Sequence, residues 1–231
     1  MDKTVMDGLF RPMSIAIIGA SETVGKIGHT VVKNLVEGQY QGKIYPVNPK
    51  ATEIMGHKVY PTVLDIPGEV DAAVITIPAK FVPDSIVECG KKGVKGLIVI
   101  TSGFSEVGDK ALEEKCVELA RQYNMRILGP NIVGTLSNSD KMNASFAPFL
   151  PYNGKASLVS QSGALLIAID AATFTRHIGF DKLISIGNMS DVDFADIITY
   201  LNDDPETTCI SLYIEGLRDG RRFMDVSRAS T

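Results

Sequence analysis

Short apolar segments recur along the first 130 residues, and the stretches between them carry apolar residues at helical spacing. The apolar runs do not alternate with polar residues, which is typical of strands buried on both faces of a parallel sheet. Repeated strand-then-helix units of this kind predict a doubly wound α/β domain over residues 1–142. The predicted strands are SIAII (14–18), KIYPV (43–47), DAAVITI (71–77), GLIVIT (96–101) and MRIL (125–128).

A second, smaller α/β domain is predicted over residues 155–231. The segment before it, NASFAPFLPYNG (143–154), has two prolines and no periodicity, and is predicted to be a linker. The same strand-and-helix alternation then returns, at about half the size of a usual open sheet. Strands are predicted at 155–160, 181–187 and 207–216, and helices at 163–177, 193–204 and 219–231.

Composition excludes several classes of protein. The net charge is −4 and the lysines and arginines are scattered, so no basic stripe indicates a nucleic acid partner. The apolar runs fall short of the roughly 20 residues that a membrane span needs, and residues 1–11 lack the apolar core of a signal peptide. The three cysteines form no CxxC pair, so we expect neither a disulfide framework nor a metal site. A cytoplasmic protein is predicted.

A glycine turn follows the first strand, in the sequence GASETVGKIG with Gly19, Gly25 and Gly28. Glycines here let phosphates approach the backbone at a helix N-terminus, where free N–H groups favour an anion. The spacing is longer than GxGxxG, and glycine turns also serve packing in many α/β proteins. The turn alone therefore leaves both interpretations open.

The end of the second strand helps to identify the nucleotide. An NAD site has Asp or Glu about 20 residues after the glycines, to bind the ribose hydroxyls. Here the strand ends in Asn48, Pro49 and Lys50, with no carboxylate. A lysine can pair with an additional phosphate, unless it is simply a solvated loop residue. The site is therefore predicted to prefer NADP or coenzyme A over NAD.

Eight motifs follow one another along nearly the whole chain. They are LFRPMSIAIIGASETVGKIGHTVVKNL, GKIYPVNPK, AAVITIPA, LIVITSGFSEVG, RILGPN, GKASLVSQSGAL, SIGNMSDVDFADIITYL and DPETTCISLYIEGLRDGRRF. Together they resemble the coenzyme A-binding half of NDP-forming acyl-CoA synthetases, specifically the α-subunit type of ADP-forming acetate–CoA ligase. This resemblance implies a Rossmann-type CoA-binding domain followed by a flavodoxin-like ligase domain. It further implies interconversion of acyl-CoA, phosphate and ADP with a carboxylate, CoA and ATP, through acyl phosphate and phosphohistidine.

The resemblance implies two sets of site residues. In the first domain, Gly19, Ala20, Ser21 and the loop to Lys26 would hold the CoA phosphates, and Lys50 would pair with a phosphate. The adenosine end would be flanked by Ile77 and Pro78, the pantetheine path lined by Ile100, Thr101 and Ser102, and the thiol end placed near Gly129, Pro130 and Asn131.

In the second domain, the resemblance assigns a phosphate site to Ser160, Gln161, Ser162 and Gly163, which open a predicted helix. Free N–H groups and two hydroxyls suit a phosphate, although an ordinary helix cap would have the same sequence. Glu215 matches a family glutamate that orients the phosphorylated imidazole as a catalytic residue. Judged without the resemblance, it is a solvated residue at the end of a strand.

The family's catalytic histidine lies in a motif such as SHTG or GHAG, which this sequence does not contain. His29, His57 and His177 are interpreted as structural. We therefore expect a fragment of a larger enzyme whose histidine lies beyond Thr231. ATP or ADP, with Mg²⁺, would bind only to a grasp domain or a partner β subunit, and the whole is expected to be an oligomer.

Two other functions stay open on the sequence. One is an NAD(P)-dependent oxidoreductase, against which stand the missing acid after the second strand and the lack of an evident general acid or base. The other is a CoA-binding module without chemistry, either alone or as a regulatory part of a protein acetyltransferase. The acyl substrate is not predicted.

Overall fold

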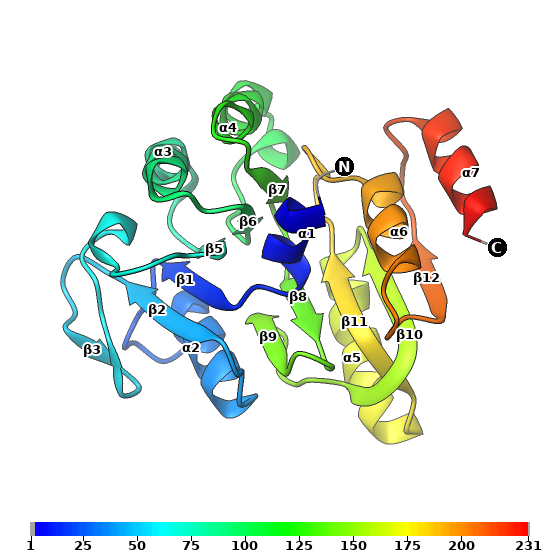
Figure 1. Cartoon of the computed structure of the whole chain (residues 1–231), viewed down its shortest axis with the longest axis horizontal. Helices are drawn as coiled ribbons and strands as arrows, with labels where there is room; N and C mark the ends of the chain where they lie inside the picture. Colours follow the sequence, from blue (N-terminus) through cyan, green and yellow to red (C-terminus); the bar gives the residue numbers. More distant parts are fainter. Residues whose placement is uncertain (1–2, 231) are drawn as a thin grey trace.

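The first of two five-stranded sheets is entirely parallel, in the order β2-β1-β5-β6-β7. The computed structural model describes residues 3–230 (Figure 1). The chain adds β2 on one side of β1 and then β5, β6 and β7 on the other side, so the strand order reverses at β1. Doubly wound sheets bind their ligands at such a point. The strands are β1 (Ser14–Ile18), β2 (Lys43–Val47), β5 (Ala72–Ile75), β6 (Gly96–Val99) and β7 (Arg126–Leu128).

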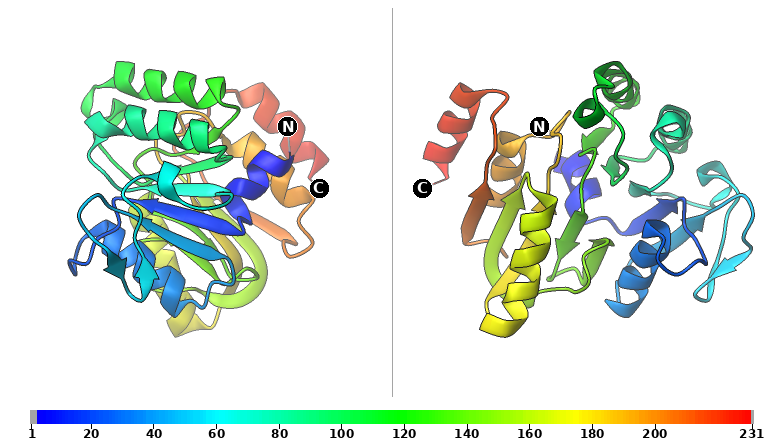
Figure 2. Two further views of the ribbon diagram at one scale, coloured as in Figure 1. Left: turned by 60° about the vertical axis from the view of Figure 1, so that its left-hand side comes forward. Right: turned by 180° about the vertical axis from the view of Figure 1, so that it is seen from behind.

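Helices cover both faces of this sheet, as the buried strands require. Helices α3 (Val82–Lys92) and α4 (Lys110–Gln122) lie side by side on one face, and α2 (Ile27–Glu37) lies on the other (Figure 2). Asp109 caps α4 by accepting the N–H of Leu112. Smaller elements are the β3 (Glu53–Ile54) and β4 (His57–Lys58) hairpin and the 3-10 turns η1 (Val63–Asp65), η2 (Ala79–Phe81) and η3 (Ser105–Val107).

The second sheet is mixed, in the order β12-β10-β11-β8-β9. Strands β12, β10 and β11 are parallel, whereas β8 runs antiparallel to β11 and to β9. Its strands are β8 (Gly134–Ser137), β9 (Met142–Ser145), β10 (Tyr152–Ser160), β11 (Gly179–Ser185) and β12 (Cys209–Tyr213). The helices are α5 (Gly163–Arg176), α6 (Phe194–Asn202) and α7 (Gly220–Ala229), which packs on α6. The predicted class, a doubly wound α/β sheet followed by a flavodoxin-like α/β unit, is confirmed.

The predicted linker at 143–154 is irregular only in its middle, over residues 146–151. Residues 143–145 belong to β9, and residues 152–154 are the first part of β10. Together β8 and β9 form a hairpin of the second sheet, although the sequence prediction assigns residues up to 142 to the first domain. Strand β9 was not predicted because its sequence contains polar residues. Asn143 and Ser145 are nevertheless buried, and the Ser145 hydroxyl donates to the Asn143 side-chain oxygen.

A single apolar core joins the two sheets. It unites Ile15 and Ile17 of β1 with Val159 of β10 and Ile184 of β11. Helix α1 (Lys3–Phe10), which the sequence analysis did not predict, fills the space between the sheets with Met6, Leu9 and Phe10 (Figure 1). The second sheet therefore helps to cover one face of the first, and the opposite face has a separate core beneath α3 and α4.

An ion-pair cluster also ties α1 to the second sheet. Lys182 is completely buried and bonds Asp181 at 2.5 Å and Asp204 at 2.6 Å. Arg11, directly after α1, pairs with the same Asp204 at 2.7 Å. Within residues 3–230, no helix combines the length and apolar character needed to cross a bilayer.

Candidate functional site

The residues predicted to bind CoA follow the carboxyl ends of the first sheet's strands. Because all five strands are parallel, these ends meet along one edge of the sheet. Distant parts of the sequence thus contribute to one surface. Gly19–Ser21 follow β1, Lys50 follows β2, Ile77 and Pro78 follow β5, Ile100–Ser102 follow β6 and Gly129–Asn131 follow β7.

Gly19 and Gly28 are required by close packing. Gly19 has φ 93°, and a Cβ there would lie 2.7 Å from Thr76 Oγ1 and 2.8 Å from Ile77 Cγ2. A Cβ on Gly28 would lie 2.0 Å from the Gly19 carbonyl oxygen. The first turn of α2 therefore lies directly against the turn that leaves β1. Packing alone explains both glycines, and it also brings a helix N-terminus to the edge of the sheet.

The loop from Ser21 to Lys26 is open to solvent. Ser21 is buried, and its hydroxyl accepts the N–H of Thr23, whereas residues 22–26 are exposed. Gly25 has φ 90° with open space around it. No described side chain caps α2, whose N-cap residue is Lys26. An uncapped helix start beside an exposed glycine loop is a surface on which an anion can bind backbone N–H groups.

Asn48 connects this glycine turn to the loop after β2. Its amide nitrogen donates to the Ala20 carbonyl at 2.8 Å, and its oxygen accepts the N–H of Lys50 at 2.8 Å. The Lys50 side chain is exposed, and no described acid contacts its ammonium group. The backbone of a lysine is thus fixed next to the glycine loop, at the place where an NAD site has a carboxylate.

Contacts also link the ends of β5, β6 and β7 in series. Thr101 donates from Oγ1 to the Ile77 carbonyl at 2.7 Å, and its own carbonyl accepts the N–H of Asn131 at 3.0 Å. Ile100 is buried, whereas Pro78, Ser102 and Asn131 are exposed. The predicted adenosine, pantetheine and thiol positions therefore form one continuous edge.

The Gly129–Asn131 turn packs against the second sheet. Gly187, after β11, comes so close that a Cβ there would lie 2.4 Å from the Pro130 carbonyl oxygen. The carbonyl of Gly129 accepts from Ser190 Oγ at 3.0 Å. The carboxyl end of β7 in the first sheet and that of β11 in the second therefore meet at this point.

The predicted phosphate site lies at the carboxyl ends of β10 and β12. Ser162 caps α5 by accepting the N–H of Leu165 at 3.3 Å, and Ser160 Oγ donates to the Ser162 carbonyl at 2.8 Å. Gln161 Oε1 accepts the N–H of Glu215 at 2.6 Å and that of Gly216 at 2.9 Å. The structure thus joins SQSG to the Glu215 loop, and the Glu215 side chain is exposed.

Gly163 connects this site to the turn after β7. A Cβ on Gly163 would lie 2.9 Å from Val133 Cγ2, two residues after Asn131. Ser162 serves as an ordinary helix cap, as the sequence allowed. The roles assigned to Ser160–Gly163 and Glu215 remain predictions.

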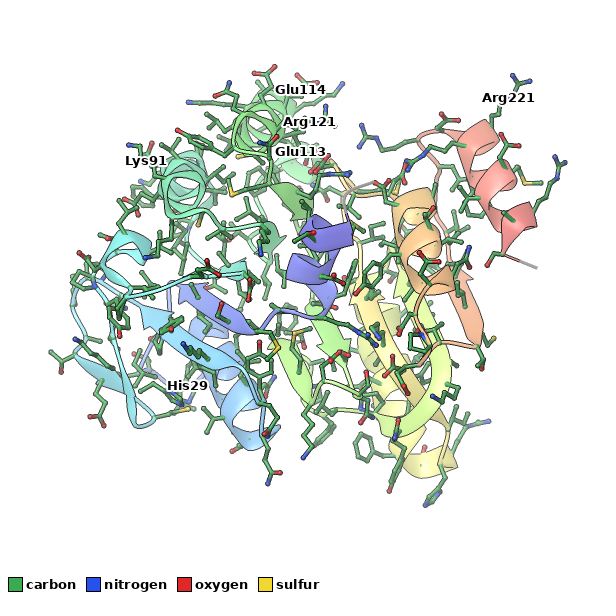
Figure 3. The ribbon with its side chains drawn as sticks, viewed as in Figure 1. His29, Lys91, Glu113, Glu114, Arg121 and Arg221 are labelled. Atoms are coloured by element: carbon green, nitrogen blue, oxygen red, sulfur yellow. The ribbon has the colours of Figure 1, made fainter. Side chains whose placement is uncertain are left out.

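The three histidines lie away from these ends of the second sheet. His29 is on α2 with Nδ1 3.1 Å from the Ser21 carbonyl oxygen (Figure 3), and His57 is in β4. His177 ends α5 with φ 54° and stacks on Tyr152, with ring centroids 5.4 Å apart.

The sequence analysis missed two further parts of the site. Asn48 and Asn188 connect its loops through side-chain amides, and only the adjacent proline and glycine signalled turns there. An ion-pair network behind the site was also missed. In it the Asp191 side chain, which is 1% exposed, binds Arg126 at 2.7 Å and Arg121 at 3.1 Å. Arg121 lies on the side of α4 that faces α6 (Figure 3).

Two family patterns match the chain in sequence. Residues 13–137 match the CoA binding domain, and residues 153–231 match the succinyl-CoA ligase like flavodoxin domain. The two matched ranges contain the first sheet and most of the second, respectively.

Curated relatives and a solved structure share this arrangement. The α subunit of acetate–CoA ligase [ADP-forming] I from Pyrococcus furiosus is 50% identical over 96% of this chain and 50% of its own length. Acetate–CoA ligase [ADP-forming] from Methanocaldococcus jannaschii is 49% identical over 94% of this chain and 30% of its own length. Dinucleotide-forming acetyl-coenzyme A synthetase 1 from Ca. Korarchaeum cryptofilum, solved with phosphate and ADP, has a TM-score of 0.95 at 44% identity, covering 97% of this chain and 49% of its own.

The chain spans half or less of the length of these relatives. The matched order of domains confirms the resemblance that the motifs indicated. This chain therefore belongs to the CoA binding domain family, joined to a succinyl-CoA ligase-like flavodoxin domain as in the ADP-forming acetate–CoA ligases.

Proposed function

We propose that this chain is the CoA-binding portion of an ADP-forming acyl-CoA synthetase. The reaction would be acyl-CoA + phosphate + ADP ⇌ carboxylate + CoA + ATP. One observation carries the proposal: the edge of the first sheet, with its uncapped helix and exposed lysine, runs directly into the carboxyl end of the second sheet. A long ligand on that edge would have its far end beside the start of α5.

The first-sheet residues would bind and orient CoA. Ser21 and the N-terminal turn of α2 would offer backbone N–H groups to the phosphates, and Lys50 would add a positive charge. The N–H groups of Gly19 and Ala20 already donate to the carbonyls of Val47 and Ile17, so these two residues would shape the turn against which the phosphates lie. Residues of the β5, β6 and β7 ends would line the adenosine and pantetheine path. The order of these contacts would place the thiol near Asn131. We propose residues 1–142 as the CoA-binding domain and residues 155–231 as the ligase domain. The hairpin of β8 and β9, which precedes residue 155, pairs with the second sheet.

The second-sheet residues would hold phosphate. Ser162 and the α5 N-terminus suit an anion, because the Ser162 hydroxyl and the first backbone N–H groups of the helix can donate to it. Ser160 is buried and would support this turn by donating to the Ser162 carbonyl. Glu215, fixed through its backbone by Gln161, would accept a hydrogen bond from the N–H of an imidazole and orient that ring. The histidine, nucleotide and Mg²⁺ would come from the remainder of the enzyme or a partner subunit. The names of the relatives favour a small carboxylate such as acetate.

The proposal is tested in the complete protein that contains this chain. Incubated with acetyl-CoA, phosphate and ADP, it should form ATP and free CoA in equal amounts, measured by luciferase and by thiol titration. Omitting phosphate should abolish both products. CoA binding without any ATP formation would instead favour a regulatory CoA-binding module. Reduction of NAD(P) by the protein would favour an oxidoreductase.

A further inference from the structure

Asn188 lies where three segments of the chain converge. It follows β11 in the second sheet, and its backbone N–H donates to the Pro130 carbonyl at 3.0 Å. Its side chain contacts Asn131 of the turn after β7 and also the η3 turn after the β6 end. A half-buried amide therefore connects the two sheets at the point where their carboxyl ends meet.

The surrounding groups determine the orientation of the Asn188 amide. Its Nδ2 lies 2.6 Å from Glu106 Oε2, 2.8 Å from Glu113 Oε2 and 3.1 Å from Ser105 Oγ. Ionised carboxylates only accept hydrogen bonds, so the NH₂ group must face them. The oxygen then faces Asn131 and accepts its Nδ2–H at 3.2 Å. Glu113 lies at the side of α4 that faces this junction (Figure 3).

Glu106 in turn holds the loop that follows the predicted pantetheine residues. Its carboxylate accepts the backbone N–H groups of Gly103 and Phe104. Burial opposes ionisation of Glu106, but these hydrogen bonds and the Asn188 amide outweigh it and keep its pKa below the usual value. The Asn188 amide thus completes a chain of contacts from residue 103 to residue 131.

The opposite side of the same loop is attached to the Glu215 segment. Arg218 donates from one guanidinium nitrogen to the Ser190 carbonyl at 2.6 Å and to the Met189 carbonyl at 3.2 Å. Arg218 lies three residues after Glu215. The 187–191 loop is therefore held on one side by the first sheet and on the other by the segment that carries the predicted catalytic glutamate.

We propose that Asn188 is a positioning residue that sets the thiol end of bound CoA relative to the phosphate site at the start of α5. This inference rests on the proposed function. Asn188 does not take part in the chemistry. It acts through Asn131 and Glu106, whose segments would bind the end of the CoA molecule, and its amide NH₂ is the group required.

The test replaces the amide by a carboxylate of the same size in the complete enzyme. Asn188→Asp puts a third acidic group against Glu106 and Glu113, which repel it and separate the segments. The expected result is a fall of at least about tenfold in kcat/KM for CoA. The Kd of CoA, measured by calorimetry, should change less than threefold, since the contacts at Gly19 and Lys50 stay intact. Phosphorylation of the enzyme by ATP, which needs no CoA, should stay within twofold of wild type.

Two further variants separate positioning from folding. Asn202→Asp adds the same charge at the end of α6, where the Asn202 side-chain oxygen accepts from Ser230, and should leave all three quantities unchanged. Glu106→Gln combined with Asn188→Asp exchanges the amide and the carboxylate, and should recover at least a third of the lost kcat/KM. An unchanged kcat/KM in Asn188→Asp would overturn the inference, as would an equal loss of phosphorylation. A wild-type enzyme without CoA ligase activity would refute the proposed function, and this inference with it.

Discussion

A Cβ atom on Gly28 would lie 2.0 Å from the carbonyl oxygen of Gly19. The first turn of α2 and the turn after β1 therefore touch through their backbones. This contact places the helix N-terminus where phosphates are proposed to bind, so that stability and ligand affinity depend on the same glycine.

Gly28→Ala should accordingly lower both the stability of the fold and its affinity for CoA. Neither backbone can move aside without shifting the loop or the helix, and overpacking of this kind costs about 1–3 kcal/mol. The expected fall in melting temperature is about 2–4 °C for each kcal/mol in a chain of this size. CoA affinity should drop as well, as measured by calorimetry.

Gly220→Ala is the matched control for Gly28→Ala. A Cβ at Gly220, the first residue of α7, would have open space around it. If Gly28→Ala binds CoA and melts like that control, the helix does not pack on the turn as described.

Lys182→Met should be strongly destabilising. Lys182 is fully buried between Asp181 and Asp204, and its loss leaves two buried carboxylates with less compensation. Breaking a buried pair costs about 3–5 kcal/mol, measured here by urea unfolding. Lys110→Met removes an exposed pair with Glu114 and should change stability by less than about 1 kcal/mol. Similar values for the two variants would contradict the buried cluster.

Asp170→Asn should stabilise the protein at neutral pH. Asp170 on α5 is fully buried, and burial raises its pKa to about 6. The folded state thus binds more protons than the unfolded chain between about pH 4 and 6, so this group lowers stability as pH rises through that interval. Above about pH 6, the ionised Asp170 carboxylate lowers the free energy of unfolding by roughly 2–3 kcal/mol, and the asparagine removes this loss.

The extra stability of Asp170→Asn over the wild type should therefore grow from pH 4 to pH 7 and then level off. Melting temperatures across this range measure it. Asp225→Asn, an exposed change on α7, should show no such trend. A gain that is constant with pH would mean that Asp170 is not ionised with an elevated pKa.

Most of the two sheets could be predicted because each of their parallel strands contains a short run of apolar residues. Strands 14–18 and 43–47 match the prediction, and the other parallel strands differ from it only at their ends. The β8–β9 hairpin was not predicted from the sequence because strand β9, MNAS, contains polar residues that become buried. The carbonyl of Ser145 in this strand accepts from Asn34 of α2, a contact between residues 111 positions apart that no local pattern reveals.

The roles of the site residues stay predictions, but the sequence did indicate which segments lie together. Glycine turns and strand ends identify the residues that a nucleotide site uses, and the parallel topology then brings them to one edge. Asn188 was missed because its importance depends on Glu106, Glu113 and Asn131, which meet only after folding. Glu215 is the opposite case, because the sequence singled it out but the fold does not explain its role. Its side chain is exposed, and its proposed role depends on a histidine from the remainder of the enzyme.

Glu215→Gln in the complete enzyme should lower phosphohistidine formation by an order of magnitude or more. The glutamine keeps size and hydrogen bonding but removes the charge that stabilises the imidazole, worth about 2 kcal/mol for a charged hydrogen bond. Labelled phosphate from ATP measures the yield. CoA affinity should not change, because Glu215 lies in the second sheet's end segment. A normal phosphohistidine yield would show that Glu215 is only a solvated strand end.

The central claim is that the first sheet's edge binds coenzyme A. Thermal unfolding of this chain with CoA, dephospho-CoA and NADH tests it most directly, because a ligand of the native state stabilises it by RT ln(1 + [L]/Kd). CoA should raise the melting temperature in proportion to the logarithm of its concentration, and NADH should not. Dephospho-CoA should act more weakly in the wild type, and Lys50→Ala should remove that difference if Lys50 binds the 3′-phosphate. An equal shift with NADH and CoA would contradict the assignment of this edge to coenzyme A.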